Sequence, residues 1–398
     1  MSFDLSRFPP PPMTSREEVT GKLAHLRSVL QRGGHDIILL DSEGAVRWLT
    51  GMRHQVIDIS PDAQSPVQVL VRLRNSSAAM TFLAARTEMP RIMDQVPMVL
   101  DQVPGTELDF SESLPPLPDS ALLPGRPGYK DALGAIVRPI VGESTGLQMR
   151  KLEWLHAMTC AVLTETALKL EPGMTGAAVR TMVFHALADR EVECNLILVA
   201  LAGQERHLHP LYSSAYRIEK GCWVKLVAGG RYAELIVSVT VMAKIGSPSK
   251  EEARIYGAIQ AGALEYADLY RSGAVESEIY REVGARFAEI ERRSGLKGFA
   301  PSAYHHHLGG PISPLGNRDY LVEERGTRRM FPWMQFAINP CEVLTNTKVE
   351  LQGIVMPEGA PLMLDGSRFL PKNLGLFSEF RSKGGTVAAV ANVVEVPA

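Results

Sequence analysis

The pattern of apolar residues divides the first third of the chain into one helix and several short strands. Leucine and valine recur at helical spacing from residue 23 to residue 30, which predicts an amphipathic helix. Thr14 or Ser15 can cap this helix, and a Gly-Gly pair at residues 33–34 ends it. Apolar runs typical of buried strands follow at residues 36–40, 67–73 and 78–83. This order of elements predicts an α/β domain over residues 1–140.

The pattern changes near residue 143, where longer helices begin. A helix with one apolar face is predicted to run through residue 170, capped by Ser144 or Thr145, and Thr175 can cap the next one. Strand-like sequence follows, then two more helices, then short strands and loops, over residues 195–246, 250–271, 276–295 and the last hundred residues. No internal repeat stands out from spacing alone. These elements predict a second domain over residues 141–398.

Composition narrows the classes of function. The chain has 398 residues, enough for two domains, and its formal net charge of −2 gives no reason to expect a nucleic-acid or membrane partner. None of the four cysteines forms a CxxC pair, so we expect reduced thiols. Residues 1–13 are proline-rich and lack the apolar stretch of a signal peptide, and no apolar run is long enough to span a membrane. We therefore expect a cytoplasmic protein.

Several motifs, in order, resemble one known family. Residues 36–40 and Trp48-Leu-Thr-Gly51 are similar to the N-terminal domain of creatinase and prolidase. The C-terminal domain of the same family is matched, in order, by residues 148–151, 170–175, 221–246, 306–309 and 338–355. The chain thus resembles the creatinase, prolidase and methionine aminopeptidase family over nearly its whole length. The resemblance implies an α/β N-terminal domain plus an α+β pita-bread C-terminal domain.

The resemblance also implies where metal ligands would stand. The family's metal enzymes hold two divalent ions with two Asp, one His and two Glu, because carboxylates bridge such cations and the pair activates a water. Val227 and Ser238 stand at the two Asp positions, and Asn339 stands at the first Glu position. His306 and Glu350 match the remaining His and Glu. Since valine cannot bind a cation and serine and neutral asparagine are poor substitutes for carboxylates, we expect no dinuclear metal site and no cofactor.

Creatinase is the metal-free precedent that the resemblance offers. It cleaves a C–N bond with side chains alone and uses a histidine at the place of His209, although His207 is a rival because the loop length there is uncertain. An imidazole titrates near neutral pH, which suits a general acid or base. We therefore predict a metal-independent creatinase-like hydrolase or lyase acting on a small polar metabolite, with His209, His306 and Glu350 as catalytic residues. The predicted substrate-binding residues are Ser238, Thr240, Asn339, His207 and Arg53.

Other interpretations of these residues remain open. His306 and Glu350 can form a leftover hydrogen-bonded pair in an inactive site, which would make the protein a non-catalytic binding module. His209, His306 and Glu350 are also the residue set of a mononuclear metal site, which would give an Xaa-Pro peptidase-like hydrolase. Creatine itself fits poorly, because Asn339 replaces a glutamate that holds the cationic substrate of creatinase.

The resemblance implies a homodimer as well as a small-molecule substrate. In this family the N-terminal domain of one subunit usually closes the site of the other. The loop after Gly51, with Arg53 and His54, is placed to do so, or it is an ordinary polar surface loop.

Overall fold

The structure, a computed structural model, describes nine segments of the chain. They are residues 3–51, 64–74, 77–100, 103–137, 146–204, 214–300, 310–312, 322–342 and 347–397. Across these segments, no helix is both long and apolar enough to cross a membrane. The predicted domain boundary at residue 140 and the caps Ser144 and Thr145 lie outside the described residues, and the boundary stays a prediction.

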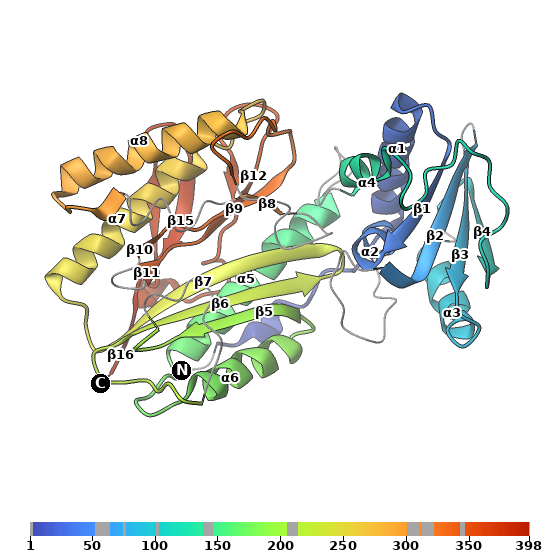
Figure 1. Cartoon of the computed structure of the whole chain (residues 1–398). Coiled ribbons are helices and arrows are strands. Elements are labelled where there is room, and N and C mark those ends of the chain that lie inside the picture. The colour runs from blue at the N-terminus through green and yellow to red at the C-terminus, as the bar shows by residue number, and fades with distance from the viewer. Residues whose placement is uncertain are drawn as a thin grey trace.

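The N-terminal domain is a four-stranded sheet covered by helices (Figure 1), which agrees with the predicted α/β class. Its strands lie in the order β1-β2-β3-β4, antiparallel except for the parallel pair β3 and β4. The strands are β1 (Ile37–Ser42), β2 (Gln64–Arg74), β3 (Ser77–Ala84) and β4 (Thr106–Ser111). The helices are α1 (Arg16–Arg32), α2 (Glu43–Thr50), α3 (Met89–Leu100) and α4 (Tyr129–Ile136). One apolar core joins the helices to the sheet.

Capping residues explain where the first two helices begin and end. Of the two predicted caps of α1, the structure selects Ser15, whose hydroxyl accepts a hydrogen bond of 3.2 Å from the Glu18 amide. Helix α2 was not predicted from the pattern. Ser42 caps its start, and Gly51 ends it with φ of +70°. A Cβ at Gly51 would lie 2.7 Å from the Met13 carbonyl oxygen, so this position requires glycine.

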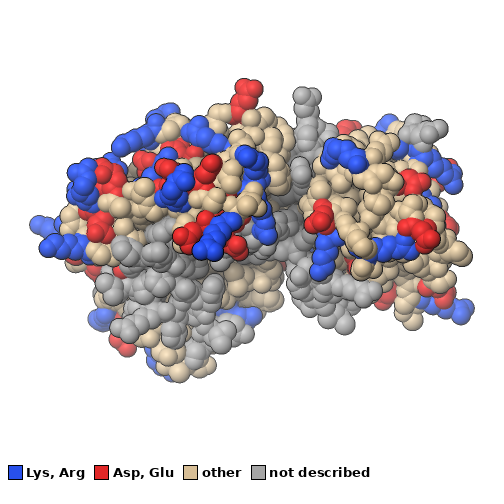
Figure 2. Space-filling view, turned by 45° about the horizontal axis from the view of Figure 1, so that its top comes forward, with Lys and Arg blue, Asp and Glu red and all other residues tan. Residues whose placement is uncertain are grey.

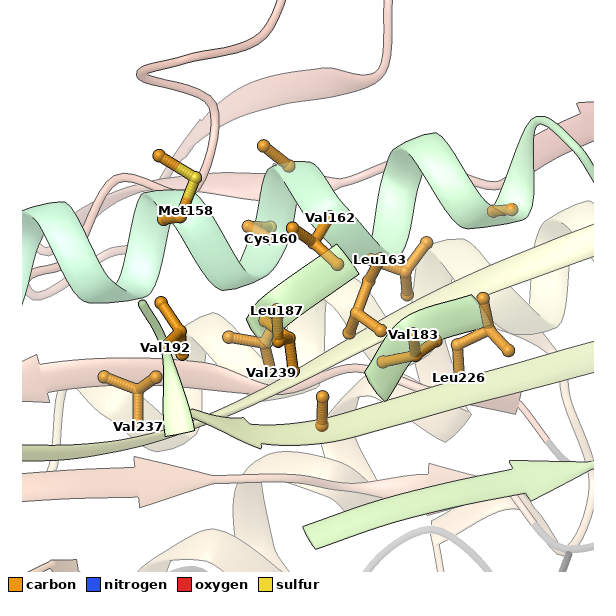
Figure 3. Packing of buried hydrophobic residues seen from close by; sticks show 14 of the residues in the cluster. Met158, Cys160, Val162, Leu163, Val183, Leu187, Val192, Leu226, Val237 and Val239 are labelled. Carbon is orange, nitrogen blue, oxygen red and sulfur yellow. The ribbon is translucent and has the colours of Figure 1, made fainter. Parts of the chain in front are cut away.

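The C-terminal domain begins with two helices that cover one face of a second sheet. Thr175 caps the second of these helices, as predicted. The helices are α5 (Gly146–Ala167) and α6 (Gly176–Ala188). A short 3-10 turn, η1 (Leu5–Arg7), lies at the start of the chain. The strands lie in the order β16-β7-β6-β5, namely β16 (Val394–Val396), β7 (Leu235–Ile245), β6 (Trp223–Tyr232) and β5 (Glu193–Ala200). Figure 3 shows side chains of these elements meeting in one apolar core, with Leu163, Leu187 and Val239 near its centre.

A second pair of helices covers a third sheet. Helices α7 (Lys250–Ala267) and α8 (Glu276–Ser294) start where predicted and end one to four residues early. The strands lie in the order β13-β12-β9-β8, namely β13 (Leu362–Met363), β12 (Leu351–Ile354), β9 (Gln335–Ile338) and β8 (Gly310–Ile312). Two hairpins complete the domain, β10 (Cys341–Glu342) with β11 (Thr347–Lys348) and β14 (Phe377–Arg381) with β15 (Val387–Ala391), and a 3-10 turn η3 spans Lys372–Leu374.

The two halves of this domain share a detail that spacing alone did not reveal. After α5, the Gly173 amide donates to the Ile218 carbonyl at 2.8 Å, and Arg217 donates back to the Gly173 carbonyl at 2.9 Å. After α7, Gly273 bonds to Met330 at 2.8 Å and Arg329 bonds to Gly273 at 3.0 Å in the same pattern. The turns after α5 and α7 are therefore held by the same pattern of hydrogen bonds.

Residues from the N-terminal segment and from α1 pack against the C-terminal domain. Phe3 and Leu5 join its core, and the Trp154 indole donates to the Phe8 carbonyl at 2.9 Å. In Figure 1 the N-terminal end lies beside α6, on the side away from the first sheet. A buried group of four charges lies where α1, α5 and the β6–β7 turn meet, formed by Glu18, Lys22, Lys151 and Glu234.

Positive and negative side chains are interspersed on the face seen in Figure 2. Lys and Arg lie beside Asp and Glu over both domains, and no large area of one sign is visible among the described residues there. This distribution agrees with the small net charge of −2.

Candidate functional site

The two halves of the C-terminal domain enclose a polar interior between their sheets. On β7, alternate residues such as Val237 and Val239 point into the core with α5, so Ser238 and Thr240 point the other way. On β6, Val227 and Gly229 lie directly opposite Thr240 and Ser238 in register and share that face. In the third sheet, Ala337 of β9 lies in one apolar cluster with Ile236 of β7. The face of β9 and β12 that carries Ala337 therefore lies against the face of β7 that carries Ser238 and Thr240.

Glu350 lies at the centre of this interior, between β11 and β12. Its Oε2 accepts a hydrogen bond of 2.7 Å from the Thr240 hydroxyl and lies 3.2 Å from the Lys348 ammonium. The Glu350 side chain is fully buried. Buried carboxylates need such partners in place of their hydration, and Thr240 and Lys348 fix the position of the Glu350 side chain.

The positions that resemble metal ligands do not form a site suited to a pair of divalent ions. Val227 is buried and offers no donor atom, and Ser238 and Asn339 are buried but neutral. The Lys348 ammonium already lies on the Glu350 carboxylate and would repel a cation there. Among the described residues, no three His, Cys, Asp or Glu side chains come together in a way that could hold a metal ion. The donor set therefore does not fit the family's dinuclear centre.

A second lysine reaches the same interior from β6. Lys225 is in register with Met242, on the same face as Val227, and only 1% of it is exposed. Burial lowers the pKa of Lys225 to about 8, the nearby Cys341 thiol raises it, and the Lys348 charge lowers it further. Cys341 and Lys348 lie directly opposite each other across the β10–β11 hairpin. Lys225, Lys348 and Cys341 thus form one group at one end of the interior, and sequence analysis did not single out Lys225.

Two glutamines line the other end. Gln335 donates to the Ile236 carbonyl at 2.9 Å, and its Oε1 has no hydrogen-bond partner in the part of the chain that is described. Gln352 is in register with Ala337 and faces β7, and both of its amide atoms are buried without a described partner. Buried amides are rarely left unsatisfied in folded proteins, so the Gln352 amide is an unusual group in this interior.

The structure describes four of the eight residues predicted for the site. Glu350 and Thr240 contact each other, and Ser238 and Asn339 are buried on the same interior or beside it. The other four, His209, His207, His306 and Arg53, lie outside the described residues. The prediction that Lys348, Glu350 and Gln352 share a face is supported by the Lys348–Glu350 ion pair. Lys225 and Gln335 were missed because their importance depends on contacts between strands, which spacing does not reveal.

Comparison with known proteins agrees with this architecture. Residues 150–377 match the model of metallopeptidase family M24. The dipeptidase PepE from Mycobacterium ulcerans superposes with a TM-score of 0.64 at 16% identity, covering 97% of this chain and 100% of that one. The Xaa-Pro dipeptidase from Bacillus anthracis gives 0.63 at 17% identity, covering 87% and 97%. A variant of Escherichia coli aminopeptidase P gives 0.64 at 14% identity, covering 91% and 97%. No curated protein sequence matches this chain significantly.

The fold and these matches define a two-domain protein with an α/β N-terminal domain and a pita-bread C-terminal domain. The chain belongs to metallopeptidase family M24. The fold and family that the resemblance predicted are therefore confirmed.

Proposed function

We propose that this protein is a metal-independent hydrolase that cleaves a C–N bond of a small polar metabolite. The observation that carries the proposal is Glu350, a buried carboxylate held at 2.7 Å by Thr240 and at 3.2 Å by Lys348, where the family's metal enzymes have a ligand. An ammonium in this place stabilises negative charge without a metal ion. The same residues also allow a lyase, which would break the C–N bond by elimination instead of hydrolysis.

In the hydrolytic form, Glu350 acts as the general base. It removes a proton from water, the water oxygen bonds to the carbonyl carbon, and the C–N bond breaks. The proton passes to the leaving nitrogen, so that an amide and one water give an acid and an amine. Lys348 stabilises the negative charge that develops on the carbonyl oxygen. His209 and His306 remain predicted partners in the proton transfers.

The first test is turnover without metal. Protein purified without added metal is assayed for amine release from a panel of small amides and ureido compounds, with and without a chelator. We expect turnover that the chelator does not change, and a loss of about 100-fold or more in Glu350→Gln. Glu265→Gln is the matched control, since Glu265 is also ion-paired, at 3.0 Å to Arg286, but lies outside the interior.

The alternatives predict other results in the same assay. The name of one similar structure, an Xaa-Pro dipeptidase, favours an Xaa-Pro peptidase-like hydrolase, for which the sequence suggested a residual mononuclear metal. That function predicts bound metal by elemental analysis, loss of activity with the chelator and cleavage of Xaa-Pro dipeptides. A non-catalytic binding module predicts no turnover of any compound and no effect of Glu350→Gln. Either result contradicts the proposal.

We also propose that the protein acts as a homodimer in the cytoplasm. The support for the dimer is the resemblance to the creatinase and prolidase family, whose members usually form homodimers in which one subunit closes the site of the other. Light scattering coupled to size-exclusion chromatography tests it, and a mass of one chain, 43.6 kDa, would contradict the dimer.

A further inference from the structure

Two buried glutamine side chains share the face of β9 and β12 that lies against β7. Gln352 lies directly opposite Ala337, and Gln335 is two residues from Ala337 on the same strand, so these three side chains point the same way. Ile354, opposite Gln335, completes a patch of two amides and two apolar side chains. Each glutamine is only 1% exposed. In such apolar surroundings a hydrogen bond is stronger than in water.

Three polar atoms of this pair have no hydrogen-bond partner among the described residues. The Gln335 amide nitrogen donates to the Ile236 carbonyl at 2.9 Å, and because a carbonyl only accepts, this bond fixes which atom of the amide is Oε1. Gln335 Oε1 is buried without a partner, and so are both Oε1 and Nε2 of Gln352. The pair therefore presents two acceptors and one amide nitrogen that carries two hydrogens.

A terminal carbamoyl group, –CO–NH2, matches this set of atoms. Its carbonyl oxygen accepts from Gln352 Nε2, while the N–H on the same side as that oxygen donates to Gln352 Oε1, which gives an amide pair joined by two hydrogen bonds. The second N–H points away from this pair and donates to Gln335 Oε1. An N-substituted amide has only one N–H, and a carboxylate has none and would bring negative charge to two acceptors, so both fit less well.

We propose that Gln335 and Gln352 form a subsite for the terminal carbamoyl group of a small primary amide or ureido compound. The inference rests on the proposed function, of which it names the substrate class. Glu350 precedes Gln352 by two residues, so their Cα atoms are at most about 7 Å apart. A carbamoyl group held by Gln352 therefore lies within reach of a water molecule that Glu350 activates.

The test compares three neutral probes of similar size. Propionamide and methylurea both end in a carbamoyl group, whereas in trans N-methylpropionamide a methyl group replaces the N–H that would face Gln352 Oε1. Binding to the full-length protein is followed by ligand-observed NMR, which detects weak ligands. We expect both carbamoyl probes to bind about tenfold or more tightly than N-methylpropionamide, because its methyl group prevents the amide pair. The tighter of the two identifies carboxamides or ureido compounds as the source of the group.

Gln352→Met keeps the length of the side chain and removes its hydrogen-bonding atoms. We expect this variant to bind all three probes within about threefold of one another. Because the atoms removed have no partner among the described residues, the variant without probe should also unfold at a higher urea concentration than wild type. Propionamide should raise the urea midpoint of wild type and leave that of the variant unchanged.

Gln260→Met is the matched control. Gln260 is a buried glutamine of α7, but its amide nitrogen donates to the Ala391 carbonyl at 2.8 Å. This variant should therefore unfold at a lower urea concentration than wild type and keep the tenfold preference for the carbamoyl probes.

The inference and the proposed function fail in different ways. Equal binding of the three probes to wild type, no binding at the limit of solubility, or a preference that survives in Gln352→Met would overturn the inference. A Gln352→Met protein less stable than wild type would also overturn it, because the amide would then have a structural role. Metal-independent turnover that is lost in Glu350→Gln would in each case still support the proposed function. Binding with the expected preference, but without turnover of any compound, would keep the subsite and refute the hydrolase.

Discussion

His156 of α5 is a buried histidine that the fold keeps neutral. Its Nδ1 has no hydrogen-bond partner among the described residues. Burial lowers the pKa of His156 to about 4, although the nearby Asp365 and Glu350 oppose this shift. Because the pKa in the folded state lies below the unfolded value near 6.5, the unfolded chain takes up this proton first as the pH falls. The contribution to stability is therefore complete above pH 6.5 and is lost as the pH falls toward 4.

Replacing His156 should remove this dependence on pH. In wild type, we expect the free energy of unfolding to fall by up to about 3 kcal/mol from this residue alone between pH 6.5 and pH 4. In His156→Leu that part of the fall should disappear, as measured by urea unfolding at several pH values. His185→Leu, at an exposed histidine of α6, should keep the wild-type slope. The same slope in wild type and His156→Leu would contradict this account.

At the scale of single residues, the sequence predicted identities better than contacts. Matching motifs predicted Glu350 as a site residue and put Val227, Ser238 and Asn339, which are poor metal ligands, at the family's carboxylate positions. The motifs could not show that the Lys348 ammonium lies 3.2 Å from Glu350. They also could not bring in Lys225, because the approach of β6 to β11 joins positions more than a hundred residues apart.

Within the elements, the close packing of α5 on β6 depends on a glycine. A Cβ at Gly230 would lie 2.5 Å from the Thr159 hydroxyl and 3.3 Å from the Leu155 Cδ1, both on α5. We expect Gly230→Ala to lower the free energy of unfolding by about 1–3 kcal/mol, because the helix must move away from the sheet. Urea unfolding followed by circular dichroism measures the change.

Gly257 provides the matched control for that variant. It lies in α7, and a Cβ there would meet no atom within 4 Å. Gly257→Ala should therefore raise the free energy of unfolding by about 0.5–1 kcal/mol through helix propensity. If Gly230→Ala were as stable as Gly257→Ala, the contact between α5 and β6 would not be as close as described.

The sequence predicted some elements better than others for physical reasons. Helices with a capping residue at their start, such as α1 and α6, were predicted closely, because local hydrogen bonds determine where they begin. Helix α2 has only eight residues, all of them buried, and is too short for helical spacing to predict it. Strands of two to four residues, such as β9 and β12, are too short for an alternating pattern, and their pairing determines where they lie.

At the scale of the whole molecule, one lysine joins the two domains. The Lys151 ammonium of α5 lies 2.9 Å from a Glu18 oxygen of α1 and 2.8 Å from a Glu234 oxygen at the β6–β7 turn. It also donates to the Met13 carbonyl at 2.8 Å, at the end of the N-terminal segment. All three charged side chains are buried, so each depends on the others for the interactions that water would otherwise provide.

Removing Lys151 should therefore lower the free energy of unfolding by more than the loss of a single ion pair would. We expect Lys151→Met to lower the free energy of unfolding by about 3–5 kcal/mol, because two buried carboxylates lose one of the two ammonium groups that the described residues place on them and keep Lys22. Limited trypsin digestion should also become faster at Arg7 and Arg16, which flank the segment that Lys151 holds. Arg74→Ala is the control, since its pair with Glu107 is more than 60% exposed on both sides and should contribute under about 1 kcal/mol. A Lys151→Met protein within about 1 kcal/mol of wild type, digested at the same rate, would show that packing alone holds the domains together.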